Sequence, residues 1–152
     1  NVTPRDEPPL APDYTPKAAN TTRRILVVED DFVSRSLLLA MLQSYGRCDV
    51  AVNGAEAVAA VELALGQNWQ YDLITLDIMM PELGGHEALA AIRIGETTHR
   101  FPHPRRAKVI MTTALSDYEN FHRAYLGSCD AYIVKPLSKA VLLRQLRRVG
   151  IE

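Results

Sequence analysis

Short apolar runs alternate along this chain with longer stretches in which apolar residues recur every three or four positions. Runs rich in Val and Ile, without polar alternation, are typical of strands buried on both faces of a parallel sheet. Four such runs lie at residues 25–28, 73–76, 109–112 and 131–134, and a more polar strand is expected at about 48–52. Helical periodicity between the strands predicts helices at about 32–45, 55–65, 86–94, 117–126 and 138–149.

Five strands alternating with five helices predict an α/β fold. The expected architecture is a flavodoxin-like, doubly wound (βα)5 sandwich around a five-stranded parallel sheet. The core-facing residues expected on the first helix are Leu37, Leu38, Met41 and Leu42. Those expected on the second helix are Val58, Val61 and Leu65. Asp31 or Asp30 is expected to cap the first helix, because a carboxylate accepts hydrogen bonds from free backbone N–H groups there.

Each of the four apolar runs ends in a polar residue that can act on phosphate or metal. In chain order these residues are Glu29-Asp30-Asp31, Asp77, Thr113 and Lys135-Pro136. In open parallel sheets, ligands bind beyond the carboxyl ends of the strands. An acid cluster, a hydroxyl and an ammonium group are therefore expected to converge on one edge of the sheet.

In these segments the chain resembles response-regulator receiver domains, of the kind seen in single-domain chemotaxis regulators. The matching segments are ILVVEDD (25–31), YDLITLDIMMPELGG (71–85), VIMTTA (109–114) and DAYIVKP (130–136). They occur in family order, and the resemblance covers about residues 23–149. It implies a phosphorelay domain that takes a phosphoryl group from the phosphohistidine of a histidine kinase or phosphotransfer protein and then switches the binding of a downstream partner.

The resemblance implies a role for each polar strand end. Asp77 would be the phosphoacceptor, in a reaction that depends on Mg²⁺, with Mn²⁺ as the alternative ion. The implied metal ligands are Asp30, Asp77, the backbone carbonyl of Met79 and, through a water, Glu29. Three consecutive acids allow the match to slip by one residue, and the helix-cap role is favoured for Asp31.

Lys135 would balance the charge of the phosphoryl group, with a cis peptide bond before Pro136. Thr113 and Tyr132 would form the switch, which is expected to act through the surface of the fourth helix, the fifth strand and the fifth helix. Thr112 neighbours Thr113, but alternation along a strand points the two side chains to opposite faces, and the spacing to Lys135 favours Thr113. A homodimer through the same surface is left open.

The main rival is an enzyme, an aspartyl-nucleophile phosphatase of the haloacid-dehalogenase type. That chemistry needs a second Asp two residues after the nucleophile as general acid, and Met79 stands there. A flavodoxin-like cofactor binder is a further alternative, although three acids after the first strand would repel phosphate. No enzymatic turnover is expected beyond self-phosphorylation and slow autodephosphorylation, because neither Met79 nor Leu115 can orient a water.

Composition excludes several partners. The formal net charge of −1 makes nucleic acid an unexpected ligand, and no apolar run is long enough to span a membrane. Cys48 and Cys129 form no metal or redox motif and are expected to be reduced thiols of a cytoplasmic protein.

Residues 1–22 contain five of the nine prolines and no apolar periodicity, so they predict a flexible tail or linker before a receiver domain at 23–152. The long basic loop at 95–106 is expected to be a solvated insertion, with an acidic partner or nucleic acid as the alternative. A stand-alone regulator and the C-terminal receiver module of a hybrid histidine kinase both remain open.

Overall fold

The structure is a computed structural model that describes residues 23–101, 105–121 and 128–151. The strands are β1 (Arg24–Val28), β2 (Arg47–Ala51), β3 (Leu73–Asp77), β4 (Lys108–Thr113) and β5 (Ala131–Val134). The helices are α1 (Phe32–Leu42), α2 (Gly54–Gly66), α3 (Gly85–Thr98), α4 (Leu115–Phe121) and α5 (Lys139–Arg148). Among the described residues, no helix is both long and apolar enough to cross a membrane.

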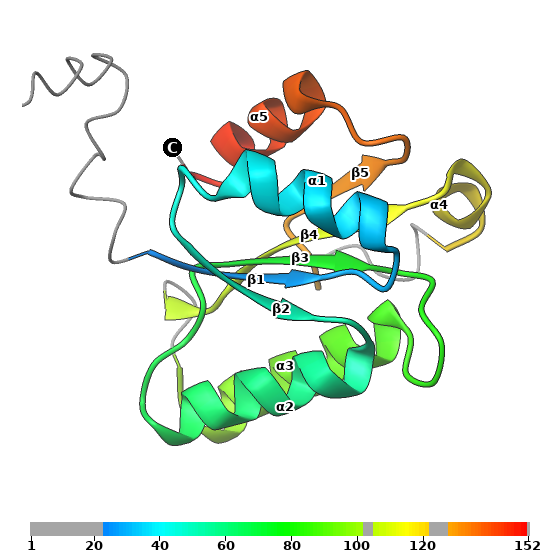
Figure 1. The fold of residues 1–152 in the computed structure, drawn as a ribbon. Coiled ribbons are helices and arrows are strands. Elements are labelled where there is room, and N and C mark those ends of the chain that lie inside the picture. Colours follow the sequence, from blue (N-terminus) through cyan, green and yellow to red (C-terminus); the bar gives the residue numbers. More distant parts are fainter. Residues whose placement is uncertain (1–22, 102–104, 122–127, 152) are drawn as a thin grey trace, which may run out of the picture.

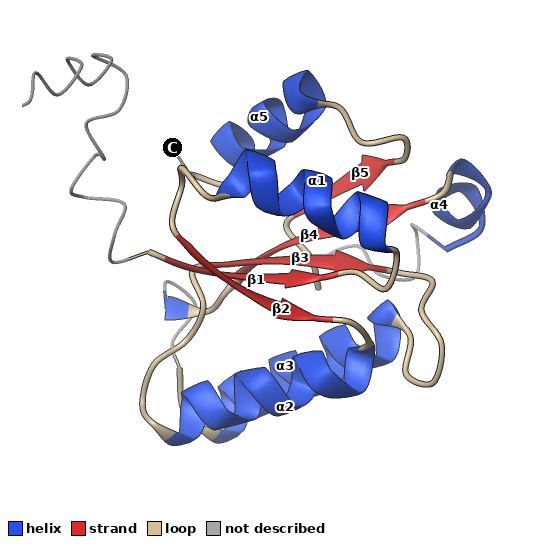
Figure 2. Ribbon diagram, viewed as in Figure 1, coloured by secondary structure: helices blue, strands red, loops and turns tan. Residues whose placement is uncertain are grey.

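The five strands form one parallel sheet in the order β2-β1-β3-β4-β5. Helices α1 and α5 cover one face of this sheet, and α2 and α3 cover the other (Figures 1 and 2). Helix α4 lies beyond the carboxyl end of β4 (Figure 1). The predicted doubly wound α/β fold is confirmed.

Two apolar clusters fill the spaces between the sheet and its helices. Alternation along the strands sends successive side chains to opposite faces. The cluster under α1 and α5 includes Ile25, Val27, Leu73, Ile110 and Ile133. The cluster over α2 and α3 includes Leu26, Val28, Ile74, Leu76 and Met111. The sheet is thus buried on both faces, and its carboxyl edge is free to present polar groups.

Side chains cap the starts of three helices. The Asp31 carboxylate accepts a hydrogen bond from the backbone N–H of Ser34 at 2.8 Å, so the predicted cap of α1 is confirmed. Asn53 caps α2 and Ser138 caps α5 in the same way. The chain therefore turns into these helices close to the ends of the preceding strands.

Helix α3 extends further than the sequence predicted. It continues to Thr98, so the prediction of a loop beginning at Gly95 was wrong. The last turn is held by Glu96, whose fully buried side chain accepts hydrogen bonds from Arg93 and from the backbone N–H of Ala107. Residues 102–104 of the predicted basic loop lie outside the described residues.

Smaller corrections concern α1 and α4. Leu37 was expected in the core but is 47% exposed, because the buried stripe runs through Leu38 and Leu42, one turn apart. Helix α1 ends at Leu42, earlier than predicted, and α4 begins at Leu115, earlier than predicted. The predicted end of α4 at 126 and the predicted tail at 1–22 lie outside the described residues.

Candidate functional site

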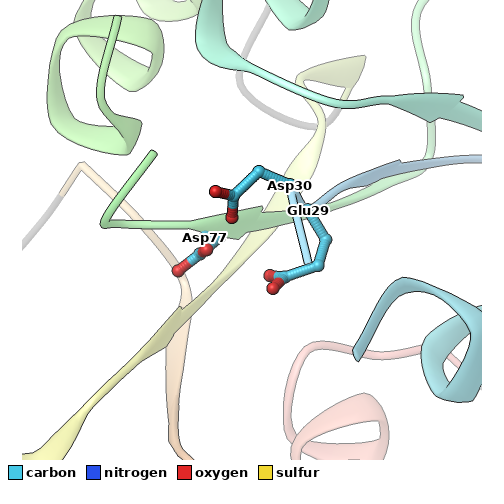
Figure 3. Close-up of side chains that lie close together, drawn as sticks. All are labelled: Glu29, Asp30 and Asp77. Atoms are coloured by element: carbon cyan, nitrogen blue, oxygen red, sulfur yellow. The ribbon is translucent and has the colours of Figure 1, made fainter. Parts of the chain in front are cut away.

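Polar side chains from three strand ends meet at the carboxyl edge of the sheet. Glu29 follows β1, Asp77 is the last residue of β3, and Lys135 follows β5. Alternation places all three on the face covered by α1 and α5. Figure 3 shows Glu29 and Asp77 together with Asp30, whose exposed side chain lies beside them. The predicted convergence of acids and an ammonium group is therefore present.

Lys135 bridges the two buried carboxylates. Its Nζ donates to Glu29 Oε1 at 3.0 Å and to Oε2 at 3.3 Å. The same Nζ lies 3.5 Å from Asp77 Oδ2. The Glu29 side chain is fully buried and that of Asp77 is 5% exposed, whereas 26% of the Lys135 side chain is exposed. The ammonium group is thus bound more closely to Glu29 than to Asp77.

Backbone contacts hold Asp77 and Lys135 in place. The backbone N–H of Met79 donates to Asp77 Oδ1 at 3.3 Å. Gly85 starts α3 directly against β3, where an added Cβ would lie only 2.3 Å from the carbonyl oxygen of Asp77. The Lys135 N–H donates to the carbonyl of Thr113 at 2.7 Å, and the peptide bond before Pro136 is cis, as the resemblance implied.

Burial raises the pKa of Asp77 to about 7, and the negative charge of Glu29 adds to this rise, while Lys135 opposes it. Burial also lowers the pKa of Lys135, but the hydrogen bond that it donates to Glu29 and the charge of Asp77 outweigh that effect and raise the pKa above its ordinary value. In the absence of a cation, one ammonium group therefore does not fully compensate the carboxylates.

Three carboxylates are placed where they could hold one metal ion. Glu29, Asp30 and Asp77 each offer an oxygen, and these oxygens all lie within 4.8 Å of one another. A set of hard oxygen donors suits Mg²⁺. Asp31 is engaged in capping α1, where the backbone hydrogen bond from Ser34 lowers its pKa. Of the three consecutive acids, Glu29 and Asp30 thus lie beside Asp77, whereas Asp31 caps α1.

The two threonines at the end of β4 lie on different faces. Thr113 is fully buried on the α2 and α3 side, and its hydroxyl donates to the carbonyl of Ala114 at 3.0 Å. Thr112 shares the α1 and α5 side with Asp77, which is its register partner in β3. Alternation within the strand separated Thr112 from Thr113, but the place of Thr112 beside Asp77 follows from the register of β3 and β4.

Tyr132 of β5 is half-buried over the α2 and α3 cluster. Its ring packs edge-on against Tyr118 of α4, with 5.6 Å between the ring centroids. The predicted switch residues Thr113 and Tyr132 therefore lie on the same side of the sheet, and Tyr132 contacts the helix that follows Thr113.

Arg93 and Phe101 are structural, although Phe101 was expected in the solvated basic loop. Arg93 reaches inward from α3 to Glu96 at 2.7 Å and to Asp130 at 3.4 Å. Phe101 is 4% exposed within the core, with the Arg105 guanidinium 4.6 Å from its ring centroid. Neither residue is available to dock an acidic partner or to stack on a base.

The family model of the response regulator receiver domain matches residues 25–147. The chain belongs to the response regulator receiver domain family, the receiver domains of two-component systems found in response regulators and hybrid histidine kinases. Such domains serve in signalling and are not conventional enzymes.

Curated relatives come from proteins of different organisation. Hybrid signal transduction histidine kinase L of Dictyostelium discoideum is 33% identical over 128 residues, which are 84% of this chain and 7% of that protein. Regulatory protein VanRB of Enterococcus faecalis is 33% identical over 132 residues, covering 84% and 54%. Chemotaxis protein CheY of Treponema pallidum is 33% identical over 128 residues, covering 83% and 81%. The chain thus spans a small part of the hybrid kinase and about half of VanRB.

Solved structures agree with the fold. The receiver domain of a sensor histidine kinase from Pseudomonas aeruginosa, with magnesium coordinated in its active site cleft, has a TM-score of 0.66 at 33% identity over 84% of this chain and 98% of that one. Response regulator TrrA of Thermotoga maritima, in complex with Mg²⁺ and BeF, has a TM-score of 0.64 at 32% identity, with the same coverage. The Saccharomyces cerevisiae complex of phosphotransfer protein Ypd1 with the Ssk1 receiver domain gives a TM-score of 0.69 at 25% identity, covering 84% and 88%.

Proposed function

We propose that Asp77 accepts a phosphoryl group from the phosphohistidine of a histidine kinase or a phosphotransfer protein. A carboxylate oxygen of Asp77 forms a bond to phosphorus while the phosphorus–nitrogen bond breaks. The bonding electron pair stays on the imidazole nitrogen, which takes up a proton from solvent. The single observation that carries this proposal is the buried Asp77 carboxylate with Lys135 Nζ 3.5 Å away, where the ammonium group can balance phosphoryl oxygens.

Mg²⁺ is the proposed cofactor, with Mn²⁺ as the alternative. Asp30, Asp77 and the Met79 carbonyl would bind it directly, and Glu29 through a water. The indirect role fits Glu29, because both of its oxygens already accept hydrogen bonds from Lys135. When bound, the ion offsets the negative charge of the carboxylates and of the phosphoryl oxygens. The relatives from Pseudomonas and Thermotoga, which hold Mg²⁺, support this assignment.

The proposed output is a change at the α4-β5-α5 surface. Phosphorylation adds about 1.5 to 2 negative charges and three acceptor oxygens, which would attract the Thr113 hydroxyl away from the Ala114 carbonyl. Tyr132 would then move into the space that Thr113 leaves. Its edge-on contact with Tyr118 supports a coupling to α4. A downstream protein, or a second copy of this chain, would recognise the altered surface.

Two organisations fit this proposal. The domain would act as a stand-alone regulator or as the receiver module of a hybrid histidine kinase, since both kinds of protein occur among its relatives. The Ypd1–Ssk1 complex supports a phosphotransfer protein as the donor. The free thiols Cys48 and Cys129 support a cytoplasmic setting.

A phosphatase of the haloacid-dehalogenase type is disfavoured by the site. The position two residues after Asp77 holds Met79, whose apolar side chain is 60% exposed and offers no general acid. Leu115 is also apolar and exposed. Because neither Met79 nor Leu115 can orient a water, spontaneous hydrolysis of the Asp77 phosphate is proposed to be slow.

The experiment is to incubate the chain with Mg²⁺ and acetyl phosphate and to follow its intact mass and oligomeric state. We expect a base-labile adduct of one phosphoryl group on the wild type that decays slowly after the donor is removed. Asp77→Asn should form none. The matched control is Asp31→Asn, a nearby acid whose replacement can still cap α1. An undiminished adduct on Asp77→Asn, or none on the wild type, overturns the proposal.

A further inference from the structure

A buried hydroxyl adjoins Asp77 on the same face of the sheet. The Cα of Thr112 in β4 is the direct register partner of the Cα of Asp77 in β3. Because β3 lies between β1 and β4, Thr112 flanks Asp77 on one side while Glu29, which follows β1, flanks it on the other. Thr112 is therefore the lateral neighbour of Asp77 within the site.

The Thr112 hydroxyl has no evident structural use. The residue is 1% exposed, and its oxygen has no hydrogen-bond partner among the described residues. A valine would fill the same volume without the cost of burying an unpaired hydroxyl. Because this unpartnered hydroxyl is the neighbour of a reactive carboxylate, it is available to that carboxylate in another state of the molecule.

The two oxygens of Asp77 are in different surroundings. Oδ1 accepts the Met79 N–H, whereas Oδ2 is the oxygen near Lys135, which follows β5. The Thr112 side chain lies beside this carboxylate, because Thr112 and Asp77 are register partners and share one face of the sheet. Rotation of Thr112 about χ1 between staggered positions redirects its hydroxyl without moving the backbone.

We propose that Thr112 is a positioning residue for Asp77. In the state that accepts phosphate, the Thr112 hydroxyl donates a hydrogen bond to Oδ2 of Asp77 and fixes the orientation of the carboxylate. This inference rests on the proposed function, because it assigns a role within the same reaction. It differs from the role proposed for Thr113, whose hydroxyl donates to the Ala114 carbonyl here and would move toward the phosphoryl oxygens only after transfer.

Thr75 provides a matched control in the same core. It is fully buried, has a hydroxyl without a partner among the described residues, and shares the face of Asp77. It lies two residues earlier in β3, about 7 Å along the strand, beside Val27 and Ile110. Thr75→Val therefore removes a buried hydroxyl from the same core, as Thr112→Val does, but leaves Thr112 beside Asp77 unchanged.

The test compares Thr112→Val, Thr112→Ser and Thr75→Val in the full chain. The initial rate of adduct formation is measured at saturating Mg²⁺ and acetyl phosphate, together with the melting temperature. We expect Thr112→Val to slow phosphorylation by about tenfold, the usual effect of losing a hydrogen bond to a charged group, and Thr112→Ser to restore most of the rate. Thr75→Val should react like the wild type, and both valine variants should melt no lower than the wild type.

The outcomes separate this inference from the proposed function. A wild type that forms no adduct overturns both. A wild type that reacts while Thr112→Val reacts equally fast overturns only the role of Thr112. A slow Thr112→Val that serine does not rescue, or an equal slowing by Thr75→Val, attributes the effect to core packing and also overturns the role of Thr112.

Discussion

The Asp77 carboxylate lies where a negative charge is disfavoured. Burial is the main cause of its raised pKa, and the fully buried Glu29 beside it is the second. Lys135 offsets part of this, but it forms closer contacts with Glu29. An added positive charge would stabilise the ionised form of such a carboxylate, so the acid cluster suits a divalent cation. The same burial of negative charge lowers the stability of the metal-free protein.

A pH dependence of stability follows for the metal-free protein. The folded-state pKa of Asp77, about 7, exceeds its ordinary value of 3.8, so the folded state binds the proton more tightly than the unfolded state does. The contribution of Asp77 to the free energy of unfolding should therefore be largest below about pH 4, fall as the pH rises to about 7, and level off above that. Asp77→Asn should remove this decline and stabilise the protein by about 2 kcal/mol at about pH 8.

The measurement is urea unfolding across this pH range with a chelator present, for the wild type and Asp77→Asn. Added Mg²⁺ should restore stability to the wild type above neutral pH and have little effect on the variant. A difference in stability between Asp77→Asn and the wild type that does not widen between about pH 4 and 7 would contradict the assigned environment of Asp77.

Single residues differed in how well the sequence predicted them. The acids and Lys135 were predicted because each follows a recognisable strand, and Asp31 because a helix start needs a cap. The lateral pairing of Thr112 with Asp77 was not predicted. Periodicity within one strand gives the face of a side chain, whereas register between β3 and β4 depends on how the whole sheet assembles.

At the scale of elements, the junction between β3 and α3 positions the site. The N–H of Gly85 donates to the carbonyl of Ile78 at 2.9 Å, which closes the loop after Asp77. An added Cβ at Gly85 would meet backbone atoms, the Asp77 oxygen at 2.3 Å and the Ile78 Cα at 2.8 Å. Backbone atoms cannot turn aside as a flexible side chain can, so α3 would have to shift away from β3.

Gly85→Ala is therefore expected to lower the free energy of unfolding by about 1 to 3 kcal/mol and to slow adduct formation on Asp77. Gly66→Ala is the matched control, because a Cβ added at the end of α2 meets nothing within 4 Å. It should leave the rate unchanged and stability unchanged or slightly higher, since alanine favours helix. Urea unfolding and the mass assay test both, and equal behaviour of the two variants would contradict the close packing at Gly85.

The end of α3 marks the limit of prediction at this scale. The sequence predicted that a helix follows the loop after Asp77, but it placed the helix end at Ile94. The continuation to Thr98 depends on Glu96, which accepts hydrogen bonds from Arg93 and Ala107. From the sequence alone, a charged residue at this position is expected to face solvent. Those partners come together only through tertiary packing, so local periodicity could not identify them.

Across the whole molecule, different polar groups lie at the two ends of the strands, called here the carboxyl edge and the amino edge of the sheet. The carboxyl edge holds the acids and Lys135 around Asp77. The amino edge holds a buried polar network in which Glu96 accepts hydrogen bonds from Gln70 at 3.0 Å, from Arg93 at 2.7 Å and from the Ala107 N–H at 2.8 Å. These partners lie just before β3, within α3 and just before β4. The network thus ties the entry of two strands to one helix, at the far end of the strands from the site.

This separation predicts that the amino edge can be weakened without loss of the chemistry. Glu96→Gln keeps the size of the side chain but removes the charge that compensates Arg93, so it should lower the free energy of unfolding by about 2 kcal/mol. The rate of adduct formation on Asp77 should stay at the wild-type value at temperatures where the variant is fully folded.

Glu62→Gln, an exposed substitution on α2, is the control and should change neither quantity. Urea unfolding gives the stability, and the mass assay with Mg²⁺ and acetyl phosphate gives the rate. A rate for folded Glu96→Gln that falls severalfold would show that the network at the amino edge holds the carboxyl edge in its reactive geometry. In that case the two edges would act as one unit, because strands β3 and β4 would transmit a shift at their start to Asp77 and its neighbour Thr112.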